Sequence, residues 1–117
     1  MWLMLQDAFF SVVDKAKAEG CLVVRARRPG DLERYFPGAK VTKSTNTDYL
    51  FRAEVRREDV ARVVGGYVMG ITASNFKDSV KDHALHDAYM GVWSVMARLQ
   101  PTPPYSGVRS RRQGDLL

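Results

Sequence analysis

Two segments of the chain alternate between apolar and charged side chains, and this pattern constrains the fold more than any other feature. Side chains of a β-strand point to opposite faces of a sheet with a period of two. Residues 22–28 and 49–57 both follow this period, so we predict two strands of one sheet. One face of the sheet would be apolar, and the other would carry arginines, namely Arg25, Arg27, Arg52 and Arg56. A half-exposed antiparallel sheet normally has one polar face, so the arginines are equally compatible with a surface that binds nothing.

The rest of the chain predicts further strands and helices around these two segments. Residues 2–14 are rich in aromatic and β-branched residues, which predicts a long strand with a bulge near Gln6 and Asp7. A short helix is expected over residues 32–36 with Asp31 as its N-cap, and a short strand over residues 40–43. Three more helices are expected, from residue 58 to a stop at Gly70, over residues 76–81 with Asn75 as the N-cap, and around an apolar stripe from residue 85 to residue 99.

The order of these elements is strand, strand, helix, strand, strand, helix, helix. Antiparallel hairpins with helices gathered on one face form a two-layer sandwich. We therefore predict an α+β fold, with an antiparallel sheet of about four strands, helices packed on one face and the arginine-bearing face open. Residues 1–100 would form this single domain, and residues 101–117 would form a proline-led, flexible basic tail.

Composition and charge narrow the class of protein. The chain is 45% hydrophobic and 26% charged, which is typical of a globular domain and excludes the disordered and fibrous classes. Its net charge of +5 favours an acidic partner such as nucleic acid, anionic lipid or an acidic protein. Cys21 is the only cysteine, so no intramolecular disulfide can form, and we expect a cytoplasmic protein. We expect no signal peptide and no membrane-spanning segment.

A set of short motifs resembles a known family. The motifs are Phe9-Phe10-Ser11, Val24-Arg25-Ala26-Arg27, Asp48-Tyr49 with Phe51-Arg52, Asn75-Phe76-Lys77-Asp78, and Tyr89 with Val92-Trp93. With these motifs the chain resembles a family of short uncharacterised proteins from actinobacteria, other GC-rich bacteria and their phages, over roughly residues 1–100. Arg57 departs from the family by replacing the more usual serine cap, and the link from Asp78 to Tyr89 is short. The resemblance implies a bacterial or phage source and no particular activity.

Aspartates and histidines cluster between residues 78 and 87. Side chains four residues apart lie on one face of a helix, so Asp82 would meet His86, and His83 would meet Asp87. A carboxylate and an imidazole at this spacing can bind a divalent metal or act in general base catalysis. Capping of a helix start by Asp82 explains the same pattern without any chemistry. We therefore predict no catalytic, metal or cofactor site. Asp82, His83, His86 and Asp87 are weak candidates for metal ligands.

The arginines of the sheet are the predicted binding surface. Guanidinium groups bind phosphates and carboxylates through two parallel hydrogen bonds. Pairing of Arg25 and Arg27 with Glu54 on the neighbouring strand is an alternative that needs no partner. The predicted partner-binding residues are Arg25, Arg27, Arg52 and Arg56, with Lys43 as a possible addition.

Aromatic residues on this face would indicate base stacking, as on open RNA-binding sheets. The period of two places Tyr49 and Phe51 on the opposite face from the arginines, so a stacking surface is absent unless Trp2 or Phe10 supplies it. The pair Tyr89 and Trp93 either packs in the core beneath the sheet or forms a partly exposed anchor for another protein.

These observations predict a small non-enzymatic binding module that uses its basic sheet face to engage an acidic protein or a nucleoprotein. A nucleic-acid-binding protein is the first alternative. A small metal-assisted hydrolase built on the Asp and His cluster is the second. The sequence predicts no cofactor and does not define the oligomeric state.

Overall fold

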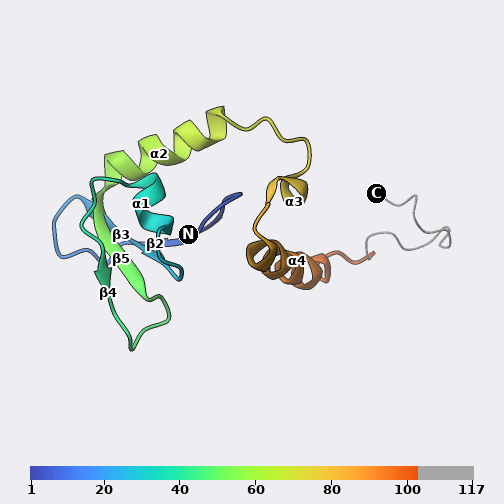
Figure 1. The fold of residues 1–117 in the computed structure, drawn as a ribbon, viewed down its shortest axis with the longest axis horizontal. Helices are drawn as coiled ribbons and strands as arrows, with labels where there is room; N and C mark the ends of the chain where they lie inside the picture. Colours follow the sequence, from blue (N-terminus) through green and yellow to red (C-terminus); the bar gives the residue numbers. More distant parts are fainter. Residues whose placement is uncertain (103–117) are drawn as a thin grey trace.

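The computed structural model describes residues 1–102, which form a five-stranded antiparallel sheet and four helices (Figure 1). The strands are β1 (Trp2–Met4), β2 (Phe9–Val13), β3 (Cys21–Ala26), β4 (Thr42–Lys43) and β5 (Phe51–Arg56). Their spatial order is β1-β2-β3-β5-β4. The helices are α1 (Asp31–Tyr35), α2 (Arg57–Met69), α3 (Phe76–Ser79) and α4 (His83–Ala97). The predicted α+β class and antiparallel sheet are confirmed, with five strands where about four were predicted.

The additional strand arises because the N-terminal segment is a hairpin, so the prediction of one long bulged strand was wrong. The amide of Leu5 donates a hydrogen bond of 2.9 Å to the carbonyl of Ala8, which closes a turn over Gln6 and Asp7. β1 and β2 then pair antiparallel on either side of this turn. Polar residues at the turn are common because they interact with solvent and with the local backbone.

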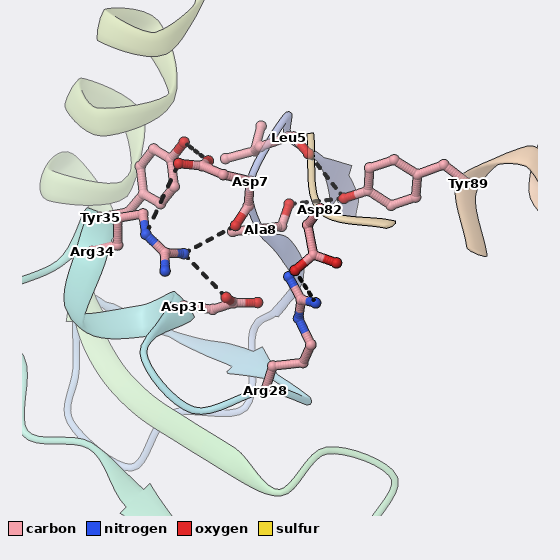
Figure 2. A network of polar contacts seen from close by, with 9 residues as sticks. All are labelled: Leu5, Asp7, Ala8, Arg28, Asp31, Arg34, Tyr35, Asp82 and Tyr89. Carbon is pink, nitrogen blue, oxygen red and sulfur yellow. Dashed lines mark hydrogen bonds and ion pairs between the residues drawn. The ribbon is translucent and has the colours of Figure 1, made fainter. Parts of the chain in front are cut away.

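Helices α1 and α2 hold this hairpin turn from one side, and Figure 2 shows the contacts made by α1. The guanidinium of Arg34 donates to the carbonyl of Asp7 at 2.9 Å, and the hydroxyl of Tyr35 donates to the Asp7 carboxylate. The amide of Gln6 donates to the hydroxyl of Tyr67 in α2 at 3.0 Å. The turn is therefore fixed by residues that lie 27 to 61 positions away along the chain.

Helix α4 holds the same turn through Tyr89 (Figure 2). Its hydroxyl is 2.9 Å from the carbonyl oxygens of both Leu5 and Ala8. A salt bridge of 3.1 Å between Arg28 and Asp82 provides a second link between the sheet region and the start of α4. The N-terminal hairpin thus connects helices α1 and α2 with helix α4.

The covered core lies between the sheet and helices α1 and α2. Alternate residues of β2, β3 and β5 point into it, as the period of two predicts. Phe10 is only 1% exposed and packs edge-on against Tyr35 and Phe36 of the α1 region, with ring centroids 5.7 and 5.8 Å away. The buried members are Leu5, Ala8, Phe10, Val12, Val24, Ala26, Leu32, Phe36, Ala53, Val55 and Val60.

The start of α1 differs from the prediction. Gly30 occupies the N-cap position with a φ of 91°, a left-handed conformation that glycine adopts without a steric penalty. Asp31 is therefore the first residue of the helix and is buried, with a salt bridge of 3.2 Å to Arg34. Burial raises the pKa of Asp31, and its hydrogen bond to Arg34 opposes that rise.

The two predicted caps further along the chain are present. The side chain of Asn75 accepts hydrogen bonds from the amides of Lys77 and Asp78, at 3.1 and 3.4 Å, and so begins α3. α3 ends at Ser79 instead of residue 81, because Val80 adopts an extended conformation. Asp82 then caps α4 by accepting from the amide of Leu85 at 3.0 Å.

Helix α4 is only partly covered. Leu85 and Tyr89 are buried together with Val80, and this group packs against Met4 and Phe9 of the N-terminal hairpin. Met4 pairs with Phe9 on the face opposite Phe10, so α4 lies on the other side of the sheet from α1 and α2, and the prediction that all helices pack on one face was wrong. The predicted stripe continues beyond Tyr89, but its later residues are exposed. The exposed fractions are 42% for Val92, 56% for Met96 and 75% for Leu99.

The two residues of the aromatic pair on α4 differ in burial, and the role of the pair as an anchor for another protein stays a prediction. Tyr89 is buried, whereas Trp93 is 43% exposed.

Within residues 1–102, no helix has the length and apolar character needed to cross a bilayer. The predicted basic tail lies, from residue 103 onward, outside the described residues.

Candidate partner-binding face

Strand pairing places five side chains in one row across the sheet. Trp2 lies opposite Ser11, Ser11 opposite Arg25, Arg25 opposite Arg52, and Arg52 opposite Thr42. Directly opposed residues share a face of the sheet, so this row crosses all five strands on the face turned away from the covered core. We call this surface the arginine face; it bears Trp2, Ser11, Arg25, Arg27, Arg52 and Arg56.

Arg25 and Arg52 lie side by side at the centre of this face without a carboxylate partner. Arg25 donates to the hydroxyl of Ser11 at 2.7 Å, and Arg52 donates weakly to the carbonyl of Tyr49 at 3.4 Å. The Nε atom of each arginine is buried and has no hydrogen-bond partner. No salt bridge within residues 1–102 involves Arg25, Arg27 or Arg52. Two directly opposed like charges destabilise a sheet, so a bound anion would reduce the repulsion between Arg25 and Arg52.

Tyr49 lies on the arginine face, so its predicted orientation was wrong. The guanidinium of Arg25 is 4.6 Å from the centre of the Tyr49 ring, and that of Arg27 is 4.2 Å away. The cause is that β5 begins only at Phe51, so the period of two does not extend back to Tyr49. Phe51 itself packs against the covered core, as predicted. Tyr49 is only 4% exposed, which leaves its ring no open surface for a nucleic-acid base.

A hollow of about 470 Å³ lies over the central arginines, and we call it the basic groove. Arg25 and Arg52 contribute to its lining from β3 and β5. Lys15 and Lys17 contribute from the loop after β2, and Lys40 contributes from the segment before β4. Five cationic side chains therefore surround one recess. Charges of one sign gathered in a recess concentrate counter-ions of the opposite sign, so the groove is suited to a carboxylate or phosphate.

Glu54 is the acidic residue of the groove, and it holds the loop that carries the lysines. Its carboxylate accepts hydrogen bonds from the amides of Lys17 and Ala18, at 2.8 and 3.2 Å. These backbone hydrogen bonds lower the pKa of Glu54, so it stays ionised and bound to the loop. The alternative in which Glu54 pairs with Arg25 and Arg27 is therefore wrong.

The other predicted cations lie away from the groove. Arg56 faces Cys21 at the far end of β5, is exposed, and is 3.5 Å from Glu58. Lys43 lies opposite Phe51, which places it on the other face of the sheet, with its amine 5.9 Å from the Phe51 ring centre. Its inclusion with the arginines was wrong, because the register of the short strand β4 sets its side.

A second recess of about 380 Å³ lies beside the groove, between the sheet and α4. We call it the apolar hollow. Its lining is formed mainly by Met4, Phe9, Leu85, Ala88, Tyr89 and Val92. Trp2, Arg27 and Tyr49 also contribute to it from the arginine face. The guanidinium of Arg27 is 5.7 Å from the centre of the Phe9 ring and so bridges Phe9 and Tyr49.

The residues of the Asp and His cluster lie in the first turns of α4 or directly before it, where Asp82 caps the helix. Asp82 caps the helix and pairs with Arg28, which lowers the pKa of its carboxyl. His86 is 3.8 Å from its neighbour Asp87, and His83 is an exposed residue in the first turn. In the described part of the chain, no three His, Cys, Asp or Glu side chains come close enough to hold a metal ion.

Sequence reasoning found the two central arginines but missed the lysines that surround them. Lys15, Lys17 and Lys40 lie in connecting segments, where no periodic pattern predicts the side on which a side chain emerges. Their position next to the predicted strand ends was the available signal for their closeness in space, since the loops that connect neighbouring antiparallel strands gather at the ends of a sheet. Comparison with protein-family models, with curated proteins and with solved structures found no match to this chain, so the family resemblance stays a prediction.

Proposed function

We propose that this protein is a small non-enzymatic binding module whose arginine face engages an acidic protein or a nucleoprotein. The observation that carries the proposal is the pair Arg25 and Arg52, opposed across two strands with no carboxylate partner among residues 1–102. Charge-assisted hydrogen bonds from guanidinium to carboxylate are roughly twice as strong as neutral ones. A bound carboxylate would both accept such bonds and relieve the repulsion between the two arginines.

The shape of the basic groove supports a protruding acidic group as the ligand. The groove is a recess, and the lysines around it come from two different loops, so they surround a ligand instead of lining a flat surface. Lysine and arginine together provide both flexible and fixed donors. An acidic side chain entering from the partner would meet cations on several sides.

Nucleic acid is the second candidate, and one observation favours it. Trp2 lies in the same row as Arg25 and Arg52 and is 74% exposed. A nucleic-acid base could stack on its indole while phosphates occupy the groove. The covered ring of Tyr49 limits the stacking surface to Trp2 and the half-buried Phe9, which is why we place this candidate second.

The experiment compares two double variants that remove the same charge. Arg25→Gln with Arg52→Gln alters the groove, whereas Arg57→Gln with Arg62→Gln alters exposed arginines of α2. Binding of a labelled peptide of Asp and Glu is measured by fluorescence anisotropy at several salt concentrations. The groove variant should bind about tenfold to a hundredfold more weakly, and the α2 variant should bind within about twofold of the native protein.

Two further results separate the candidates. Equal weakening by both double variants would mean that overall charge, not the groove, drives binding, and would contradict the proposal. Single-stranded DNA is tested in parallel with Trp2→Ala. Tight DNA binding that Trp2→Ala weakens, together with weak peptide binding, would favour the nucleic-acid candidate.

A further inference from the structure

The apolar hollow continues the proposed binding surface beyond the basic groove. Its lining comes from Arg27 and Trp2, from the hairpin residues Met4 and Phe9, and from α4. Figure 1 shows α4 beside the N-terminal hairpin, on the far side from the strands β4 and β5. The volume of about 380 Å³ falls within the range of small-ligand pockets, which are mostly apolar with a few polar groups.

The groove and the hollow are neighbours on one face. Arg25 contributes to the groove, Arg27 contributes to the hollow, and Tyr49 contacts both guanidiniums. Successive residues of an extended chain advance about 3.3 Å, so positions two apart are separated by about 7 Å. An extended segment bound along this face would pass from groove to hollow within about two to four residues.

From this arrangement, and resting on the proposed function, we infer that the hollow receives a large apolar side chain from the same acidic segment that fills the groove. The partner motif is then one or more Asp or Glu residues with a Leu, Ile, Met, Phe or Trp two to four residues away. Carboxylates bind the cations of the groove, and the apolar residue anchors the segment against α4. Recognition of a peptide by a charged site and an adjacent apolar pocket supplies both attraction and specificity.

The lining of the hollow favours an amino-acid side chain over a nucleic-acid base. Met4, Leu85 and Val92 are aliphatic and offer no side-chain hydrogen bonds to the edge of a base. Asp31 also lines the hollow, but it is buried and paired with Arg34, so the ion pair offers no free cation to a phosphate. Arg28, the second cation of the hollow, is already paired with Asp82. An apolar side chain in the hollow meets none of these costs, because the acidic residues of the same segment lie outside the hollow, on the side of Arg27.

The test selects peptides without assuming the answer. A displayed library of random linear peptides of about twelve residues is selected on the full chain. The expected result is enrichment of the motif stated above, with its acidic and apolar residues at the stated spacing. In a synthetic copy of an enriched peptide, replacing the apolar residue by alanine should weaken binding about tenfold or more, as expected for the burial of one large apolar side chain.

A matched pair of variants on α4 assigns that effect to the hollow. Ala88→Phe fills the hollow, and Ser94→Phe adds the same ring to the same helix at an exposed position outside it. The Ala88→Phe variant should bind the enriched peptide and its alanine copy equally. It should bind the alanine copy as tightly as the native protein does. With Ser94→Phe, the difference of about tenfold should remain.

The outcomes distinguish this inference from the function on which it rests. Acidic peptides enriched without an apolar residue would overturn the inference and leave the proposed function intact. Enrichment of no peptide, or of apolar peptides without acidic residues, would overturn both. If Ala88→Phe weakens binding of single-stranded DNA, or dissociates a dimer of the native chain, the hollow has another occupant and the inference is wrong.

Discussion

The covered core and the α4 cluster use similar residue types but are stabilised differently. The covered core contains eleven buried residues from strands and helices, so apolar packing dominates it. The α4 cluster contains three, Val80, Leu85 and Tyr89, and is joined to the hairpin by the hydroxyl of Tyr89 and to Arg28 by Asp82. Burial of apolar area is the main stabilising term in folding. The comparison indicates that the sheet with α1 and α2 sets the stability of the domain, while α4 is attached to it by fewer contacts.

This difference has a functional consequence for the arginine face. The basic groove lies over β3 and β5, so its floor belongs to the most extensively packed part of the domain. The apolar hollow has α4 as one wall, so its width depends on the weaker attachment. A partner that fills the hollow would add apolar contacts to α4, whose cluster has three buried residues against eleven in the covered core.

The largest expected effect comes from breaking the covered core. Phe10→Ala removes an aromatic ring that is 1% exposed and packs against Tyr35 and Phe36. The free energy of unfolding should fall by about 3–5 kcal/mol, measured by urea denaturation. Phe10→Leu is the control and should cost clearly less. A loss below about 1 kcal/mol for Phe10→Ala would show that the core does not carry the stability.

A smaller effect is expected from loosening α4 through its main polar attachment. Tyr89→Phe keeps the ring but removes the hydroxyl that bonds to the carbonyls of Leu5 and Ala8. The free energy of unfolding should fall by about 1–3 kcal/mol, because the two carbonyls lose the hydroxyl hydrogen that they share, although that of Ala8 still accepts from the Leu5 amide. Hydrogen exchange should become faster in α4 and remain slow in β2 and β3. Uniform acceleration across the sheet would mean that α4 and the covered core unfold as one unit.

The smallest effect is expected from alkaline pH acting on the same tyrosine. Burial raises the pKa of Tyr89 above its usual value of 10.0. A group with a higher pKa in the folded state contributes stability below its unfolded pKa and loses that contribution as the pH rises. Between about pH 9 and pH 11 the free energy of unfolding should fall by about 1 kcal/mol on account of Tyr89.

Denaturation at several alkaline pH values, with Tyr89→Phe as the control, checks this expectation. The variant should lose less stability over the same interval, because it cannot ionise at this position. The pKa of Tyr35, in α1, is also raised, mainly by burial and to a smaller extent by its hydrogen bond to Asp7. It should therefore supply a similar decline in both proteins. Identical pH profiles would indicate that the Tyr89 hydroxyl is not protected from ionisation.

Much of the fold follows from local patterns in the sequence. The alternation of residues 22–28 and 49–57 correctly predicted β3 and β5, and pairing then brought Arg25 and Arg52 together. Turn and cap residues were informative where they act locally, as at Asn75 and Asp82. The N-terminal hairpin was missed because its turn, at Gln6 and Asp7, contains no glycine and is fixed largely by Arg34, Tyr35 and Tyr67 from distant helices.

The candidate site was less predictable than the strands that support it. Tyr49 reverses its expected side because the chain bends just before β5, and Lys43 does so because of the register of β4. Lys15 and Lys17 lie on a loop that Glu54 holds, and the contacts of Glu54 with the Lys17 and Ala18 amides span more than thirty residues of chain. Such contacts form only after the strands have paired.

Local patterns along the chain are enough to predict the α+β class, the two central strands and the side of the sheet on which the central arginines lie. These features depend on the period of two and on capping, which act between residues close in sequence. Which apolar stripe is covered depends instead on how the elements pack in the folded domain. The stripe of α4 has a helical period, yet it is buried at Leu85 and exposed at Met96, because burial requires a partner surface and the sheet ends beside the first turns of that helix.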